Sequence, residues 1–112
     1  MPVIKIDYAG EKFSDDTIRE LCEYTRTATS ETMNLPLEDV TVNANKNQIT
    51  AGAYPIEIYI QASPRHFPDE LIMEKILDGM KEKIAAFKSL HNIQTPFNIA
   101  IIKMDWKFAI EI

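Results

Sequence analysis

The sequence contains one unit twice, and this internal duplication limits the folds that the chain can adopt. Each copy opens with a proline-led run of β-branched residues, continues with a phenylalanine and an acidic stretch, and closes with a proline ahead of a second apolar run. The copies cover residues 2–44 and 55–104. Because self-similarity along a chain marks a repeated supersecondary unit, we expect one domain, residues 1–112, built from two such units.

Each copy is predicted to fold as strand, helix, strand. In the first copy, residues 2–7 are rich in β-branched side chains, as in a buried strand. Ser14 is a suitable N-cap for a helix, and the two acidic residues after it suit the positive end of the helix dipole. That helix should end near Asn34 and Pro36, and a short strand should cover residues 40–44.

The second copy repeats this order with more apolar side chains. After a connector of polar and then small residues, 45–54, its first strand covers residues 55–62, and Pro68 lies near the first turn of its helix. The broad apolar stripe of this helix predicts deeper burial than in the first helix. Residues 97–103 are almost continuously apolar, which predicts a strand buried on both faces. The stripe of the helix consists of Leu71, Ile72, Met73, Ile76, Leu77, Met80, Ile84 and Phe87.

Two such units with right-handed crossovers give an α+β fold, a duplicated βαβ unit whose four-stranded mixed sheet carries both helices on one face. We expect the other face to carry alternating apolar side chains. Such a patch is too large for a monomer, so it predicts an oligomer. In the tail, residues 105–112, strict alternation of apolar and polar residues predicts a short C-terminal strand. The apolar positions of that strand are Trp106, Phe108, Ile110 and Ile112.

The composition narrows the classes of function. A net charge of −5 argues against a nucleic-acid partner, because phosphate binding needs a basic surface. The sequence has no apolar run long enough for a transmembrane helix and no secretory signal pattern, and Cys22 is its only cysteine. We therefore expect a cytoplasmic protein without a membrane partner. His66 and His91 are too isolated for a metal site, and three glycines exclude a dinucleotide fingerprint, so we expect no metal and no cofactor.

Pro2, at the start of the first strand, has a chemistry of its own. Enzymes that remove an initiator methionine favour small second residues, and proline is one of them. The nitrogen of Pro2 would then be a secondary amine, and a free α-amino group titrates near ~7.7–8.0. Burial would lower that pKa further by disfavouring the charged form. Pro2 is therefore a candidate general base, although a proline can also simply begin an edge strand.

These features resemble the tautomerase superfamily, whose members are small βαββαβ proteins, or pairs of shorter chains, with a catalytic N-terminal proline. The resemblance covers most of the chain. It rests on Pro2, on the segment 35–42, which reads Leu-Pro-Leu-Glu-Asp-Val-Thr-Val, and on Tyr54 and Pro55 ahead of a strand. It implies a homotrimer with the sheets inside and the helices outside, acting on a small-molecule substrate.

The resemblance also indicates positions that would touch substrate. Where short members of the family place a carboxylate-binding arginine in the second strand, this chain has Thr41. Where a longer member places a lysine before the helix-end proline, it has Leu35. Asn98 falls at a position where a neighbouring subunit supplies an active-site tyrosine. Asn98 and Tyr54 are candidate donors to an enolate oxygen.

A tautomerase needs a base, a group that stabilises the oxyanion and a cationic anchor for the substrate carboxylate. With Pro2 as the base, the anchor is Arg65, after the third strand, or Lys12, after the first, unless both are solvated surface charges. Arg65 would grip a carboxylate with two parallel hydrogen bonds, which Lys12 would not. Trp106 is either an apolar wall of the substrate site or an aromatic residue of an interface or core.

The prediction is therefore a tautomerase or isomerase acting on an α-keto acid or another enolisable carboxylate. One alternative is a non-catalytic homo-oligomer that reuses the fold for binding, since the usual cationic clamps are missing. Another is a ferredoxin-like regulatory module, which interleaves its strands differently. Central, antiparallel first and third strands would support that module, and parallel pairing within each βαβ unit would exclude it.

Overall fold

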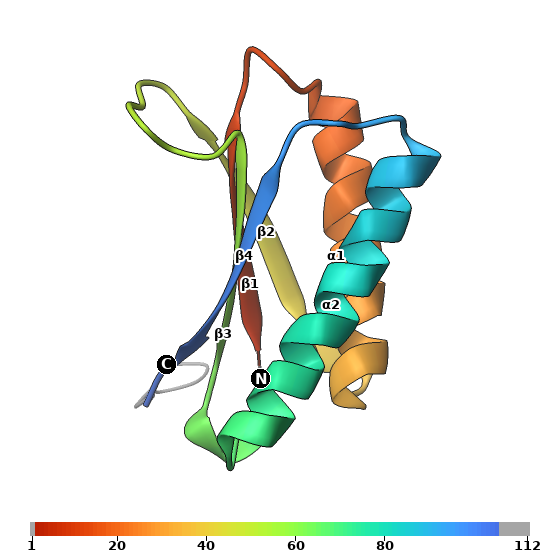
Figure 1. The fold of residues 1–112 in the computed structure, drawn as a ribbon, viewed down its shortest axis with the longest axis vertical. Helices are drawn as coiled ribbons and strands as arrows, with labels where there is room; N and C mark the ends of the chain where they lie inside the picture. Colours follow the sequence, from red (N-terminus) through yellow and green to blue (C-terminus); the bar gives the residue numbers. More distant parts are fainter. Residues whose placement is uncertain (1, 106–112) are drawn as a thin grey trace.

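The computed structural model describes residues 2–105, which form a four-stranded sheet and two helices packed against one of its faces (Figure 1). This confirms the α+β fold with a duplicated βαβ unit. Trp106 and most of the predicted C-terminal strand lie outside the described residues. The strands are β1 (Val3–Ala9), β2 (Thr41–Asn47), β3 (Ile56–Ala62) and β4 (Phe97–Lys103), the α-helices are α1 (Asp15–Met33) and α2 (Glu70–Leu90), and the short 3-10 helices are η1 (Leu37–Asp39) and η2 (Pro64–His66).

The sheet has the order β2-β1-β3-β4, so the opening strands of the two units lie side by side at its centre. Each opening strand pairs in parallel with the closing strand of its own unit, while β1 and β3 are antiparallel. In a split βαβ arrangement, another strand separates the two strands of a unit. The parallel pairing inside each unit therefore excludes the ferredoxin-like module, and the antiparallel centre does not discriminate between the two folds.

Local sequence signals set the ends of the helices. The hydroxyl of Ser14 accepts a hydrogen bond from a first-turn N–H at 3.2 Å, and Asn34 closes α1 in the left-handed region at φ 54°. Both ends of α1 are as predicted. Pro68 lies just before α2, near its first turn as predicted. Asp69 is the N-cap, and its carboxylate accepts the N–H of Ile72 at 2.9 Å.

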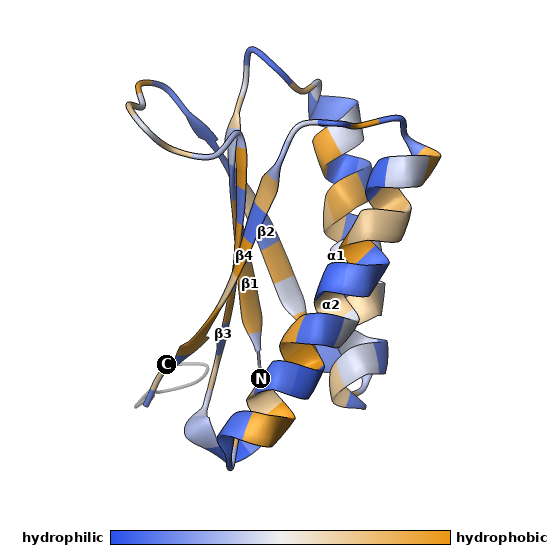
Figure 2. Ribbon diagram, viewed as in Figure 1, coloured by the Kyte–Doolittle hydropathy of each residue, from blue (hydrophilic) through white to orange (hydrophobic). Residues whose placement is uncertain are grey.

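One core fills the space between the sheet and the helices. Alternate side chains of the central strands point into it, such as Ile4 and Ile6 of β1, and the helices contribute their inner faces, such as Leu21 and Met80. Figure 2 shows that hydrophobic and hydrophilic residues alternate along the strands and that each helix contains both kinds. Because burial of apolar surface is worth about 25 cal/mol per Å², this one-sided core holds both helices on the sheet.

β2 is longer than the sequence predicts. It runs to Asn47 rather than ending near residue 44, although its last residues are polar. Parallel pairing with β1 continues as far as Ala9 opposite Asn47. The backbone hydrogen bonds of this ladder outweigh the weak strand propensity of asparagine and lysine. The connection to β3 is correspondingly shorter, residues 48–55.

Two predictions about burial in the second unit are wrong. α2 is not buried more deeply than α1, since it has four buried residues and α1 has five. Leu71 is 75% exposed because the first turn of α2 lies beyond the end of the sheet (Figure 1). β4 is not buried on both faces, because the helices cover only one face of the sheet, and Ile102, on the other face, is 37% exposed.

The face of the sheet away from the helices is polar, which contradicts the apolar patch expected from the sequence. At its centre Lys5 lies beside Tyr59, and in the next row Asp7 lies opposite Glu57. The hydroxyl of Tyr59 donates to the carboxylate of Glu57 at 3.1 Å. The expectation failed because most apolar residues of the strands face the helices, and the open face keeps only a few, such as Val3 and Ile102. By strand alternation and register, this open face consists of Val3, Lys5, Asp7, Ala9, Thr41, Asn43, Asn45, Asn47, Glu57, Tyr59, Gln61, Asn98, Ala100 and Ile102.

Candidate functional site

Pro2 lies at one end of the sheet, which we call the Pro2 end; it consists of the starts of β1 and β2, the ends of β3 and β4, and η2. Pro2 is buried, and its carbonyl oxygen accepts a hydrogen bond from the backbone N–H of Thr41 at 3.3 Å. Because β3 runs antiparallel to β1, the end of β3 lies beside the start of β1, with Gln61 opposite Val3. The turn that follows β3 therefore lies at the same end of the sheet as Pro2.

The Pro2 side chain belongs to the helix side of the sheet. Ile4, two residues further along β1, is fully buried against the helices, and alternate residues of a strand share one face. In the full sequence the nitrogen of Pro2 is joined to Met1 in a peptide bond. A basic amine therefore forms at this buried position only when Met1 is removed.

The short helix η2 brings Arg65 to the Pro2 end. Two backbone hydrogen bonds hold the turn, from the N–H of His66 to Ser63 at 3.0 Å and from the N–H of Phe67 to Pro64 at 2.9 Å. Phe67 is only 2% exposed and anchors the turn in the core. Arg65 itself is exposed, so its guanidinium is accessible to an anionic ligand.

The imidazole of His66 lies in η2, at the Pro2 end. The side chain is half-buried, and its Nε2 is buried without a hydrogen-bond partner among the described residues. Burial of the imidazole, more than the adjacent positive charge of Arg65, lowers the pKa of His66 below its usual value. The ring is therefore neutral at pH 7.

Arg26, on α1, adds a second arginine to the Pro2 end. Its Nε donates a hydrogen bond to the carbonyl oxygen of Val40 at 2.9 Å. The same peptide group carries the N–H of Thr41 that donates to the carbonyl of Pro2. One peptide group thus links the guanidinium to Pro2, and Arg26 fixes the position at which β2 begins beside it.

The other predicted substrate-binding residues lie at the opposite end of the sheet within one chain. Lys12 is in the loop that follows β1, and Asn98 is level with Asp7 across the sheet. Asp7 is five positions after Pro2 along the strand, which corresponds to a distance on the order of 16 Å. A single chain therefore brings Arg65 toward Pro2, but neither Lys12 nor Asn98.

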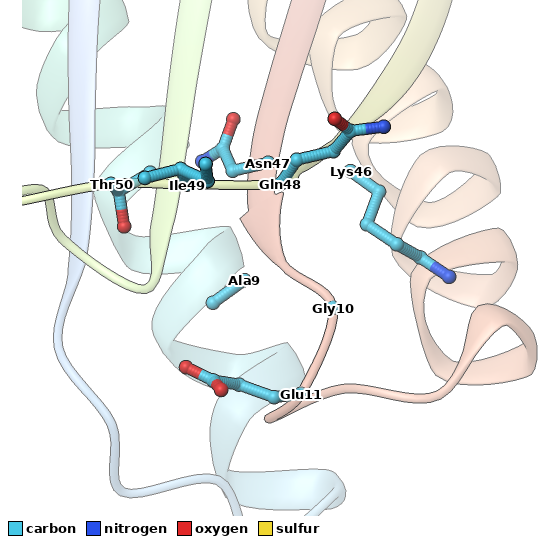
Figure 3. A pocket seen from close by; sticks show the side chains of 8 residues that line it. All are labelled: Ala9, Gly10, Glu11, Lys46, Asn47, Gln48, Ile49 and Thr50. Carbon is cyan, nitrogen blue, oxygen red and sulfur yellow. The ribbon is translucent and has the colours of Figure 1, made fainter.

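A hollow of about 540 Å³ lies at this opposite end, between the loop after β1 and the connection from β2 to β3 (Figure 3). The ammonium of Lys46 is already paired with the carboxylate of Asp15 at 3.3 Å. Asp15 also accepts the hydroxyl of Tyr8 at 3.3 Å, and the pKa of Tyr8 is raised, first by burial and then by Asp15. The length of β1 separates the hollow from Pro2. It is lined by Ala9, Gly10, Glu11, Lys46, Asn47, Gln48, Ile49 and Thr50.

Cys22 is half-buried against the core, and burial, assisted by Glu23, raises the pKa of its thiol. A thiol of raised pKa is a poor nucleophile at neutral pH. Within residues 2–105, no three side chains of His, Cys, Asp or Glu are grouped so as to hold a metal ion. No helix in the same range combines the length and apolar character needed to cross a membrane.

No protein-family model and no curated protein matches the sequence, but several solved structures match the fold. A fused 4-OT protein, solved as an asymmetric trimer, has a TM-score of 0.69 and 13% identity over 95% of this chain and 91% of its own. A 5-carboxymethyl-2-hydroxymuconate delta-isomerase has a TM-score of 0.69 and 14% identity over 97% of this chain and 89% of its own. The chain has the tautomerase-superfamily fold.

A malonate semialdehyde decarboxylase shares the tautomerase-superfamily fold, with a TM-score of 0.62 and 15% identity over 97% of this chain and 92% of its own. Its solved forms include a mutant in which a proline at position 1 is replaced by alanine. Identities this low establish the fold alone. The resemblance predicted from Pro2 and the segment 35–42 is confirmed at that level.

Sequence patterns singled out Pro2 and Arg65, which both lie at the Pro2 end, but not His66 or Arg26. His66 looks isolated in the sequence, because only the antiparallel pairing of β1 and β3 brings its turn beside Pro2. Arg26 carries no signal at all, since it is one polar residue among many on α1. Its role depends on the path of the chain from η1 into β2.

Proposed function

We propose that this protein, once Met1 is removed, is a tautomerase or isomerase that uses the Pro2 amine as a general base on a small α-keto acid or another enolisable carboxylate. One observation carries the proposal: in a chain of tautomerase-superfamily fold, Pro2 is buried at the start of β1, at the end of the sheet where η2 presents Arg65. The reaction needs no cofactor, because it only moves a proton.

A buried amine suits this chemistry. A free α-amino group titrates near ~7.7–8.0, and burial lowers its pKa because the charged form loses hydration. The positive charges of Arg65 and Arg26 at the same end disfavour the ammonium form further. A substantial share of the amine is then neutral at pH 7, where a general base works best with a pKa close to the ambient pH.

The proton transfer balances without any other reactant. The nitrogen of Pro2 takes a proton from the carbon beside the substrate carbonyl. The electron pair of the broken C–H bond forms a carbon–carbon double bond, and the π electrons of the carbonyl group move to its oxygen. The Pro2 ammonium then returns the proton to that oxygen, which completes the enol. Arg65 holds the substrate carboxylate in place with two parallel hydrogen bonds.

We also propose that the protein is a homotrimer in the cytoplasm. The trimeric state of the fused 4-OT protein supports a trimer, and the single Cys22 suits a reducing compartment. Because the open face is polar, copies would join through the free edges of β2 and β4 rather than through an apolar patch. Lys12 and Asn98 would reach Pro2 only from a neighbouring chain. Light scattering in solution should give three chain masses, and one chain mass would reject the trimer.

The catalytic proposal is tested by the rate of enol–keto conversion of an arylpyruvate. Protein from which Met1 has been removed should accelerate the conversion, and the Pro2→Ala variant should lose most of that acceleration. Removing a general base costs about 10²–10⁴-fold in rate. A wild-type rate no faster than that of Pro2→Ala would reject the proposal.

A binding protein without catalysis is the second candidate. It is favoured by Thr41 and Leu35, which stand where members of the family place cations. The mass of the protein from its natural host separates the two candidates. Full retention of Met1 would leave Pro2 without a basic amine and favour the binding protein.

A further inference from the structure

His66 is the least explained polar side chain of the Pro2 end. Its Nε2 is buried and makes no hydrogen bond to the described residues. Buried polar atoms nearly always have a partner, since leaving one unpaired costs stability. Two threonine hydroxyls, of Thr25 and Thr32, share this state, but both belong to α1 rather than to the turn beside Pro2. Among the described residues, the ring nitrogen of His66 is the one atom of this set that belongs to the turn at the Pro2 end.

The position of His66 relative to Pro2 and Arg65 suggests which partner. η2 leads from the end of β3, beside Val3, to Phe67 in the core on the helix side of the sheet. Pro2 is buried on that same side. Arg65 and His66 are consecutive residues of η2, so both belong to the turn at the Pro2 end.

An α-keto acid matches this arrangement because its carboxylate and its carbonyl oxygen are on neighbouring carbon atoms. We propose that His66 donates its Nε2–H to the carbonyl oxygen of an α-keto acid held by Arg65, and stabilises that oxygen as Pro2 converts the substrate to an enolate. The inference rests on the proposed function and narrows its substrate class to 2-oxo acids. No proton leaves His66 in this step, since Pro2 both takes the proton and returns it.

The electrostatics of the turn agree with this role. The lowered pKa keeps the imidazole neutral, and in the tautomer with its proton on Nε2 the ring is a donor that does not compete with Arg65 for the carboxylate. A neutral imidazole that polarises a carbonyl is a known catalytic device. Because Nε2 is shielded from water, the hydrogen bond to a developing negative charge would form in a medium of low dielectric, where it is strongest.

The test compares three variants of the Met1-free protein with a 2-oxo acid as substrate. His66→Phe removes the donor and should lower kcat by about 10²–10³-fold with KM changed only a few-fold. Its unfolding midpoint should be equal to or higher than that of wild type, because the unpaired nitrogen is gone. His66→Gln keeps an N–H donor and should recover most of kcat. His91→Gln, at the opposite end of the molecule, is the matched control and should match wild type.

The outcomes separate this inference from the proposed function. If Pro2→Ala loses activity while His66→Phe keeps kcat within twofold of wild type, the role of His66 is wrong and the general base stands. If His66→Phe and His66→Gln lose the same amount of activity in proportion to lost stability, His66 is merely structural. If the wild type is no faster than Pro2→Ala, both proposals fail together.

Discussion

Arg26→Met is the most informative single change for the architecture of the Pro2 end. Methionine keeps much of the apolar stem of arginine but removes the 2.9 Å hydrogen bond from Nε to the carbonyl of Val40. Val40 is 1% exposed, so water does not readily replace the lost donor. A hydrogen bond from a charged group is worth about 1.5–3 kcal/mol. Since Arg26 is only partly buried, we expect a loss near the lower end, about 1.5–2 kcal/mol.

The measurement is urea unfolding followed by circular dichroism, together with the thermal midpoint. For a domain of this size, the expected loss corresponds to a midpoint lower by about 6–8 °C. Arg19→Met is the matched control on the same helix. Arg19 is 76% exposed and pairs with Asp16 at the surface, so its loss should cost no more than about 0.5 kcal/mol. If both variants unfold at the same urea concentration, the hydrogen bond of Arg26 does not fix the start of β2.

Three further changes test other parts of the structure. Met80→Ala, at a position with no exposure, should lower the free energy of unfolding by about 2–5 kcal/mol in urea titrations; a loss below about 1 kcal/mol would contradict the packing of α2 on the sheet. Gly10→Ala places a Cβ 2.5 Å from the side chain of Lys46, which must move away from Asp15, so a crystal structure should show that ion pair broken at a cost below about 1 kcal/mol. The folded-state pKa of His66 lies below the unfolded value of about 6.5, so below that pH the unfolded chain binds more protons and wild type should lose stability relative to His66→Gln. A stability difference that stays constant from pH 8 to pH 5 would show that His66 is not buried in neutral form.

The duplication, the helix N-cap at Ser14 and the helix end at Asn34 are predictable because they depend on residues that are neighbours in sequence. The length of β2 is not, because its last residues are strand only through pairing with β1. The open face was predicted to be apolar because the number of apolar strand residues is visible in the sequence but their direction depends on register. Which face of β4 the helices cover is likewise a property of the assembled fold.

The residues of the candidate site also fall into two groups, those that a local sequence pattern marks and those that only the fold brings together. Pro2 can be singled out because its chemistry depends only on being second in the chain, and Arg65 because it is a cation in the loop after the third strand. The roles of both in a site stay predictions. His66 and Arg26 reach the Pro2 end through contacts between elements far apart in sequence, so no local pattern marks them. Lys12 and Asn98 remain predictions, since their approach to Pro2 requires a neighbouring chain.

The claim that the Pro2 amine is the general base is tested most directly by one chain in two forms, with and without Met1. The two forms differ by a single residue that blocks the nitrogen of Pro2, and every other side chain is the same. We predict that kcat/KM for a 2-oxo acid is at least about 10²-fold higher for the form without Met1, the lower bound expected for a general base. Equal values for the two forms would contradict the account.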